Sequence, residues 1–399
     1  MTTLEIGSTL DVTAERLAFG GYAIARHDSL VLFVPFAAPG DRVRVEITEL
    51  DKRHAKARLV EVLAAGPHRR EARCAHFGVC GGCQFQHVDY AEQLRQKAVF
   101  VRDAMVRTGG FEDWPEVEIH GAGEWGYRAR TQLKIDRRRM GFHRAFSKTV
   151  VEIEQCPVLA PELEQALPLL RAALDQVPHN VRVHQIEGAC GRDGAAFSPD
   201  LPGVRKDLVE HEVLGFRFLV EPDGFFQGNR LLVDRLVQHA VEGERGALAF
   251  DLYAGVGLFT LPLARGFTRV VGVEDERRAA TLGRVNTKQN GMDHVHWFRL
   301  TTEEFLRQNR ERPDVVLIDP PRLGARRALP QLLALAAPRM VYVSCDPNTM
   351  ARDLRDLVAG GYAVESVHAF DMFPQTYHVE CVAKLRWTRD AEPAPGGTS

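Results

Sequence analysis

The alternation of short apolar runs with helical patterns in the C-terminal part constrains the fold of this chain most strongly. From about residue 216 onward, each apolar run is followed by a loop and an amphipathic segment; the runs are Ala247–Tyr253, Arg269–Glu274, Asp314–Asp319 and Met340–Ser344, with a weaker candidate at His294–Phe298. Such runs are typical of strands buried in a parallel sheet. The pattern predicts a doubly wound α/β domain whose ligands bind at the carboxyl ends of the strands.

The rest of the chain divides into further units, since 399 residues exceed the usual size of one small domain. Residues 1–65 alternate apolar and polar positions between turn signals, which predicts an OB-like β-barrel. Residues 66–215 hold most of the cysteines and a basic stretch, and we expect a central α+β domain there. The α/β domain then covers 216–390, and the tail 391–399 is predicted to be disordered. The fold class is therefore multidomain α/β.

Charge is unevenly distributed along the chain. Between Asp51 and Val150 there are 19 Lys and Arg but only 12 Asp and Glu. The net charge of the whole chain is -2, so acidic residues outnumber basic ones in the rest of the sequence. This suits a basic RNA-facing surface beside an acidic catalytic unit, although a solvated charged face gives similar counts. No apolar run approaches the roughly 18 to 20 residues of a membrane span, and no signal-peptide pattern opens the sequence. We expect a cytoplasmic protein without membrane contact.

Four of the seven cysteines form a pattern. Cys74, Cys80 and Cys83 lie within ten residues, separated by glycines that allow the backbone to fold tightly, and Cys156 follows downstream before a proline. Without an export signal, these cysteines do not indicate a disulfide framework. Four thiolates fit either tetrahedral zinc or an iron–sulfur cluster, and their spacing alone does not separate the two.

The first two predicted strands end in residues suited to a nucleoside ligand. Asp251 opens the glycine-containing loop DLYAGVG, which leads into a helix expected to start at Leu258, and Glu274 ends the second strand, where a carboxylate can accept both ribose hydroxyls. A Rossmann dehydrogenase is the rival interpretation. However, Thr260 replaces its third glycine, and the Asp251 carboxylate would repel a pyrophosphate. The cationic methyl donor S-adenosylmethionine fits this loop better.

The later strand ends place chemically reactive groups at the same edge. Asp319-Pro-Pro-Arg322 resembles a signature of methylases that act on exocyclic amines, but Arg322 replaces their stacking aromatic residue, which disfavours that reaction. Cys345 follows the fifth strand just before a helix start, whose dipole favours a thiolate. Glu380 lies at the start of the last predicted strand. Taken singly, Cys345 could be a packing residue and Glu380 a surface carboxylate.

A donor site, a thiol and a carboxylate together meet the needs of methylation at carbon 5 of uracil. Carbon 5 becomes nucleophilic only after a thiolate adds to carbon 6, and a base must afterwards remove the carbon 5 proton. In this interpretation Cys345 is the nucleophile, Glu380 is the base, and Asp319 binds the imide edge of the uracil.

Five motifs resemble the RNA (uracil-5-)-methyltransferase family of RumA and TrmA type; they are FFQGN, DLYAGVG, DPPRLG, SCDPNTMARD and DMFPQTYHVE. The resemblance covers nearly the whole chain, with residues 1–65 similar to its RNA-binding TRAM domain. The four-cysteine spacing is similar to the RumA branch, where it implies a [4Fe–4S] cluster and, as substrate, 23S ribosomal RNA. The TrmA branch lacks the cluster.

The resemblance also implies roles for individual positions. It gives the same three catalytic residues, Cys345, Glu380 and Asp319, and a donor site that is formed by Gln227, Tyr253, Gly255, Gly257, Glu274 and Asp319. Two positions depart from the RumA pattern: Leu258 replaces an Asn that contacts the donor, and Thr301 falls where another polar donor contact is expected.

Three alternative functions remain open at this stage. A tRNA uracil-5-methyltransferase would use the same chemistry. A radical enzyme also combines S-adenosylmethionine with [4Fe–4S], but it needs three cysteines and one open iron, which Cys156 argues against. A non-catalytic RNA-binding iron–sulfur protein would not need Cys345 with Glu380. We further expect the protein to be a monomer.

Overall fold

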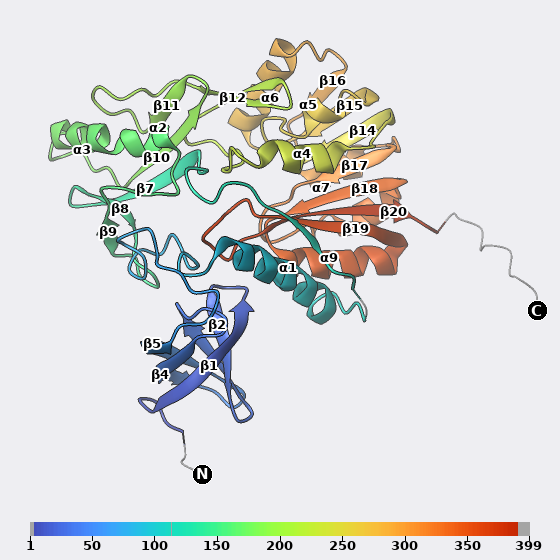
Figure 1. The fold of residues 1–399 in the computed structure, drawn as a ribbon. Coiled ribbons are helices and arrows are strands. Elements are labelled where there is room, and N and C mark those ends of the chain that lie inside the picture. The colour runs from blue at the N-terminus through green and yellow to red at the C-terminus, as the bar shows by residue number, and fades with distance from the viewer. Residues whose placement is uncertain (1–3, 113, 390–399) are drawn as a thin grey trace, which may run out of the picture.

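The computed structural model describes residues 4–112 and 114–389, and the tail that was predicted to be disordered lies outside these residues. The N-terminal part is a closed five-stranded barrel at one end of the molecule (Figure 1). Its strands β1 (Thr9–Ala18), β2 (Tyr22–His27), β3 (Leu30–Pro35), β4 (Arg42–Leu50) and β5 (His54–Ala64) are ordered β1-β2-β3-β5-β4. Alternate residues of β4 point into the barrel and are fully buried: Val43, Val45 and Ile47. The predicted barrel is confirmed.

A second sheet follows in the middle of the chain. Its five antiparallel strands, in the order β11-β10-β7-β8-β9, are β11 (Gly194–Ser198), β10 (Gln185–Gly191), β7 (Arg130–Asp136), β8 (Arg139–His143) and β9 (Val150–Glu152). Two helices, α2 (Pro161–Gln165) and α3 (Leu167–Gln176), pack apolar side chains against it. A hairpin of β12 (Val209–Val213) and β13 (Phe216–Val220) leads to the C-terminal part.

The C-terminal part is built on an eight-stranded sheet in the order β16-β15-β14-β17-β18-β20-β19-β6. The strands are β6 (Glu118–His120), β14 (Gly246–Leu252), β15 (Phe267–Val273), β16 (Val295–Phe298), β17 (Val315–Ile318), β18 (Arg339–Ser344), β19 (Tyr362–Phe370) and β20 (Glu380–Trp387). Strands β14 to β18 run parallel to one another, and β20 lies antiparallel between β18 and β19. The doubly wound sheet expected from the apolar runs is confirmed.

Helices cover both faces of this sheet. One face packs against α1 (Tyr90–Arg107), α7 (Thr302–Gln308), α8 (Leu329–Leu335) and α9 (Pro347–Gly360). The other packs against α4 (Val233–Val241), α5 (Thr260–Leu263) and α6 (Arg277–Gln289). The helix expected to open at Leu258 begins two residues later, because the loop passes through several turns first. Within the described residues, no helix has the length and apolarity that a membrane crossing demands.

Helix α1 and strand β6 come from the segment 66–215 but pack on the C-terminal sheet. Strand β6 pairs in parallel with β19, and Val101 of α1 lies in the core that α9 also covers. The neighbouring Phe100 instead joins the core of the barrel, and Gln96 accepts a hydrogen bond from the Leu17 backbone N–H at 2.9 Å. Helix α1 therefore belongs to both the barrel and the C-terminal sheet, between which it lies in Figure 1.

Candidate active site and cysteine cavity

The predicted nucleophile and base are brought together by strand pairing. Cys345 directly follows β18, and Glu380 is the first residue of β20. The two strands are antiparallel, with Ser344 opposite Cys381, so Cys345 and Glu380 lie side by side where the pairing ends. Asp319 follows the neighbouring strand β17, whose partner in the sheet is β18. Three residues far apart in the sequence thus meet at one edge of the sheet.

The charges of these groups act on one another's pKa. Burial and the neighbouring Glu380 and Asp319 carboxyls together raise the pKa of the Cys345 thiol to about 11, whereas Arg322 lowers it. Burial, with a contribution from Asp319, also holds the pKa of Glu380 well above its ordinary range, while Arg322 lowers it. Burial raises the pKa of Asp319 to about 7. Arg322 is therefore the cation that favours the charged forms of both the thiol and the base.

The effect of helix α9 on Cys345 differs from the expectation. The helix start just after Cys345 predicted a thiol pKa below its usual value. In the structure the Asp346 side chain caps this helix and accepts hydrogen bonds from the backbone N–H groups of Asn348, at 2.8 Å, and Thr349, at 3.2 Å. A carboxylate already satisfies these donors, and burial of the thiol outweighs the dipole.

The loop 371–379, which leads into Glu380, is held by buried polar contacts. Lys97 of α1 and Asp371 form an ion pair at 2.5 Å, and both side chains are fully buried. The Lys97 ammonium also donates to the Phe373 carbonyl at 3.0 Å, and the Tyr127 hydroxyl donates to the Pro374 carbonyl at 2.9 Å. A buried charge that lost such a partner would be costly. The loop is therefore fixed before a substrate arrives, and it positions the carboxylate of Glu380.

The glycine-containing loop after β14 takes the backbone shape that its sequence predicted. Gly255 and Gly257 have φ angles of 54° and 98°, and Tyr253 shares this left-handed region with a φ of 64°. Glu274, after β15, accepts a hydrogen bond from the Gly255 N–H at 2.8 Å and another from the Glu276 N–H at 2.8 Å. Burial raises the pKa of Glu274 despite these bonds. The loop and the carboxylate thus form one hydrogen-bonded unit.

Asp251 and Gln227 both precede this loop in the sequence, and both are buried. Asp251 accepts a hydrogen bond from the Thr260 hydroxyl, while its other oxygen, Oδ1, has no donor among the described residues, and burial raises its pKa to about 8. Gln227 lies in the FFQGN segment between β13 and α4. The nearby Asn229 amide donates to the Asp371 carbonyl at 3.4 Å, which ties that segment to the loop of the predicted base.

The two positions that depart from the family pattern have structural roles here. Leu258 is buried in the apolar core under α4 and α5. Thr301 caps helix α7: its hydroxyl accepts from the Glu304 N–H at 3.2 Å and donates to the Glu304 carboxylate at 2.9 Å. Leu258 has no polar group to offer a ligand, and the hydroxyl of Thr301 is engaged by its own helix.

The four patterned cysteines line one cavity between the segment before α1 and the central sheet. Cys74, Cys80, Cys83 and Cys156 all contribute to its wall. The Gly82 backbone N–H donates to the Cys80 sulfur at 3.4 Å, as backbone groups do around metal-bound thiolates. Burial raises the pKa of Cys83 to about 12 and that of Cys156 to about 11, so these thiols ionise only with a compensating positive charge.

A backbone contact that the sequence did not reveal joins the cysteine cavity to the loop 371–379. The carbonyl of Gln375 accepts hydrogen bonds from the N–H groups of Gln84, at 2.8 Å, and Phe85, at 2.9 Å, directly after Cys83. Gln375 has a φ of 69°, and its side chain is fully buried. No residue spacing signals a backbone contact across 290 positions, so only the folded chain shows it.

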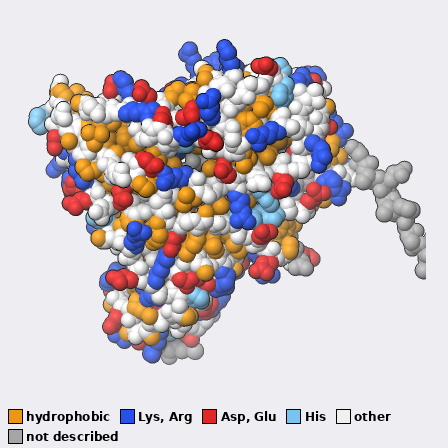
Figure 2. Space-filling view, turned by 45° about the horizontal axis from the view of Figure 1, so that its top comes forward, with side chains coloured by type: hydrophobic (Ala, Val, Ile, Leu, Met, Phe, Trp, Pro, Cys, Tyr) orange, Lys and Arg blue, Asp and Glu red, His pale blue; other side chains and the backbone are white. Residues whose placement is uncertain are grey.

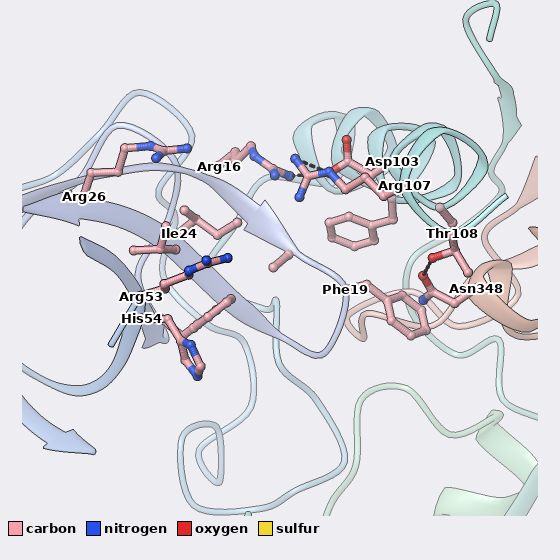
Figure 3. Close-up of a pocket in the computed structure, with 15 residues that line it drawn as sticks. Arg16, Phe19, Ile24, Arg26, Arg53, His54, Asp103, Arg107, Thr108 and Asn348 are labelled. Carbon is pink, nitrogen blue, oxygen red and sulfur yellow. Dashed lines mark hydrogen bonds and ion pairs between the residues drawn. The ribbon is translucent and has the colours of Figure 1, made fainter. Parts of the chain in front are cut away.

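Two hollows beside the barrel are lined by basic and aromatic side chains. One lies between the barrel and α1 and is lined by Arg16, Arg26 and Arg53 from the barrel and Arg107 from the helix (Figure 3). Asp103 pairs with Arg16 at 3.0 Å. The other hollow lies between the barrel, the cysteine loop and the central sheet; its lining includes Arg128, Lys134, Arg144, Phe146 and Tyr377. Figure 2 shows that Lys and Arg are otherwise dispersed among acidic side chains on the face in view.

Comparison with known proteins places this geometry in a family. The family model described as tRNA (Uracil-5-)-methyltransferase matches residues 209–387, and that of the TRAM domain matches residues 3–60. The chain is 35% identical to the 23S rRNA (uracil(1939)-C(5))-methyltransferase RlmD of Salmonella typhi over 90% of its length and 92% of the relative. The chain belongs to the tRNA (uracil-5-)-methyltransferase family. The motif resemblance noted in the sequence is therefore confirmed.

Two further relatives show how far the likeness extends. An uncharacterized RNA methyltransferase of Aquifex aeolicus is 32% identical over 94% of this chain and 98% of its own length. The crystal structure of Pyrococcus abyssi tRNA (uracil-54, C5)-methyltransferase in complex with S-adenosyl-L-homocysteine superposes with a TM-score of 0.76. It is 26% identical, and the match covers 94% of this chain and 100% of that one. The protein is thus an S-adenosylmethionine-dependent RNA methyltransferase of this family, with a TRAM domain.

Proposed function

We propose that this enzyme methylates carbon 5 of a uridine in 23S ribosomal RNA, with Cys345 as the covalent nucleophile. The observation that carries the proposal is the meeting of Cys345, Glu380, Asp319 and Arg322 at one edge of the sheet. The choice of ribosomal RNA rests on RlmD relatives from Salmonella typhi and Cronobacter sakazakii, which are 35% and 34% identical over at least 90% of the chain. A non-catalytic RNA-binding protein would have no use for this set of residues.

The residues can carry out the reaction as follows. The Cys345 thiolate forms a bond to carbon 6 of uracil, and the ring electrons move to carbon 5 and the carbon 4 oxygen. Bound S-adenosylmethionine would supply the methyl group: carbon 5 bonds to it, the sulfur–methyl bond breaks, and S-adenosylhomocysteine is left. The Glu380 carboxylate then removes the carbon 5 proton, the carbon 5–carbon 6 double bond reforms, and the sulfur leaves. Asp319, whose pKa is raised to about 7, contacts the imide edge of the uracil.

The proposed donor site fits a cationic nucleoside. Glu274 and the loop of Tyr253, Gly255 and Gly257 form one unit. The family resemblance adds the buried Gln227 of the FFQGN segment to this site. The unpartnered Oδ1 of Asp251 gives the site a buried acceptor. A sulfonium and an amino group are compatible with such an acceptor, whereas a pyrophosphate is not. Asp319 is shared by the donor and uracil sites.

We also propose that Cys74, Cys80, Cys83 and Cys156 hold a [4Fe–4S] cluster. Supporting observations are the shared cavity and the N–H donated to Cys80. When bound, such a cluster holds its ligand segments together. All four irons then have a protein ligand, so the cluster takes no part in cleaving the methyl donor.

We propose that the RNA binds along the parts of the protein formed by residues 1–65 and 66–215. The two basic hollows flank the barrel, and each offers arginine or lysine for phosphates and aromatic rings for unstacked bases. Phe146 is 81% exposed and stacks on Tyr22 of the barrel with ring centroids 6.1 Å apart. The catalytic domain 216–390 then receives the target uridine. We propose that the enzyme acts as a monomer in the cytoplasm.

A transfer RNA substrate is the alternative, because the Pyrococcus abyssi relative acts on tRNA and shares the fold over nearly the whole chain. Purified enzyme and labelled S-adenosylmethionine should be incubated separately with unmodified 23S ribosomal RNA and bulk tRNA. Nuclease digestion followed by mass mapping should find 5-methyluridine at one site in the ribosomal RNA. If only tRNA were methylated, the substrate would be tRNA and not ribosomal RNA. A methyl group on an atom other than carbon 5 would show that the proposed reaction is wrong.

A further inference from the structure

Three histidines from separate elements converge on the side of the C-terminal sheet that helix α4 covers. His120 lies on β6, His239 on α4 and His368 on β19. One ring nitrogen from each comes within 4.8 Å of the other two, which no other three potential ligands among the described residues achieve. Rings of His239 and His368 have centroids only 4.0 Å apart. None of these residues takes part in the proposed methylation.

Two ring nitrogens of this histidine triad lack hydrogen-bond partners. His120 is 5% exposed, and its Nε2 has no partner among the described residues. The buried Nδ1 of His368 also makes no hydrogen bond. Buried ring nitrogens are normally paired, because an unpaired one gives up its bond to water without replacement. A metal ion would satisfy these lone pairs.

Of the charged residues near the histidine triad, some would attract a metal ion and others would repel it. The Glu118 carboxylate lies 3.6 Å from the Nδ1 of His120 and 3.5 Å from the Nδ1 of His368. Arg235 and Lys384 oppose a further positive charge, although Lys384 is engaged by the Glu242 carbonyl at 2.7 Å. Burial lowers the pKa of all three histidines, which keeps the rings neutral and able to bind a metal.

We propose that His120, His239 and His368 form a second metal site, for a divalent ion of the zinc class, beside the Glu118 carboxylate. Three imidazoles are a ligand set that zinc accepts, and imidazole also suits cobalt and nickel. The site joins β6, β19 and α4. The His120 carbonyl accepts a hydrogen bond from the Asp371 N–H at 2.8 Å, so the bound ion also steadies the start of the loop 371–379.

Cobalt titration of the full-length protein, prepared without oxygen so that a cluster is retained, tests this site. One Co²⁺ per chain should bind and give visible d–d bands without the thiolate charge-transfer bands that cysteine ligation produces. Zn²⁺ should displace it in calorimetry. Charge-transfer bands would place the ion on the cysteines instead, and the absence of stoichiometric binding would show that the triad is only packing.

Substitutions then separate ligands from bystanders. His239→Ala changes a half-buried residue. Loss of a group that only supports a metal ligand typically weakens metal binding by roughly 10- to 100-fold, and loss of His239 should weaken Co²⁺ binding by more than that. His296→Ala is the matched control, since His296 is exposed on β16 at the opposite edge of the sheet. Glu118→Gln, at an exposed position, should weaken binding without threatening the fold. Equal affinity in His239→Ala and His296→Ala would overturn the proposal.

A second measurement tests whether a metal ion at the histidine triad stabilises the loop 371–379. Zn²⁺ should slow hydrogen exchange of the backbone amides in residues 371–379 in the native protein but not in His239→Ala. Because this readout requires neither RNA nor the methyl donor, it stands apart from the proposed methylation. Unchanged exchange on addition of Zn²⁺ would reject the link between the site and the loop.

Discussion

The protein uses cysteine in two regions that differ in what surrounds the sulfur. Cys345 stands beside two carboxyls and Arg322, all of which act on its pKa. In the cavity, Arg128 lowers the pKa of Cys80, Cys83 and Cys156, and neighbouring cysteines raise it. Burial raises the thiol pKa in both regions. In the first region, the sulfur can lose its proton to a neighbouring group. In the second region, the thiols need the positive charge of a bound metal in order to ionise.

The largest expected effect comes from removing the sulfur of the proposed nucleophile. Cys345→Ala should lower methyl transfer by about 10⁴-fold or more, because no other group can add to carbon 6. An RNA carrying 5-fluorouridine at the target should trap the native enzyme as a covalent adduct visible by denaturing electrophoresis. Trapping by the alanine variant to the same extent would show that Cys345 is not the nucleophile.

Removing the base should separate methyl transfer from product release. Glu380→Gln keeps the size of a side chain that is 2% exposed but cannot take up the carbon 5 proton. We expect turnover to fall by about 10²- to 10⁴-fold. A protein–RNA adduct carrying the new methyl group should accumulate, as measured by mass spectrometry. Normal turnover would mean that another group is the base.

In the cavity, loss of one thiol should remove the metal and leave the donor site intact. Native protein purified without oxygen should contain about four irons and four acid-labile sulfides per chain. Cys80→Ala should lose them and melt at a lower temperature, whereas binding of S-adenosylmethionine should change little in calorimetry. Cys190→Ala, at a buried cysteine outside the cavity, is the control. One zinc and no iron in the native protein would contradict the cluster assignment.

The smallest expected effect concerns Arg322, which lowers the pKa of both Cys345 and Glu380. Both groups act after losing a proton, so the rate of adduct formation should rise with pH. Without Arg322 both pKa values rise. In Arg322→Gln the plot of adduct-formation rate against pH should therefore shift to higher pH by about one unit. Arg322→Lys should restore most of the shift. An unmoved curve in Arg322→Gln would show that the cation does not control ionisation.

Much of the candidate site could be located because its residues lie at the ends of strands that apolar runs reveal. The chemistry of the reaction suggested that Cys345 and Glu380 act together, but only the structure shows that their strands, β18 and β20, are adjacent. The raised pKa of Cys345 was not, because burial depends on neighbours that only the folded chain brings together. Strand β6 has three residues and no periodic pattern. The histidine triad spans almost 250 positions and therefore has no motif.

The contact between Gln375 and the cysteine loop escaped prediction for a different reason. The acceptor is a backbone carbonyl, and every residue has one, so the sequence carries no sign of it. Helix α5 was misplaced by two residues because its four residues are too few to show a period. Patterns revealed the elements that bury apolar side chains, but not the polar contacts between those elements.

Helix α1 limits how far the protein can be treated as an assembly of modules. Phe100 belongs to the core of the barrel and its neighbour Val101 to the core of the C-terminal sheet. A chain begun after the barrel would therefore expose Phe100 and leave Gln96 without the Leu17 N–H that it binds. The two parts should melt in one cooperative transition rather than two. In evolutionary terms, an ancestor could not have gained or shed the barrel without remodelling this helix.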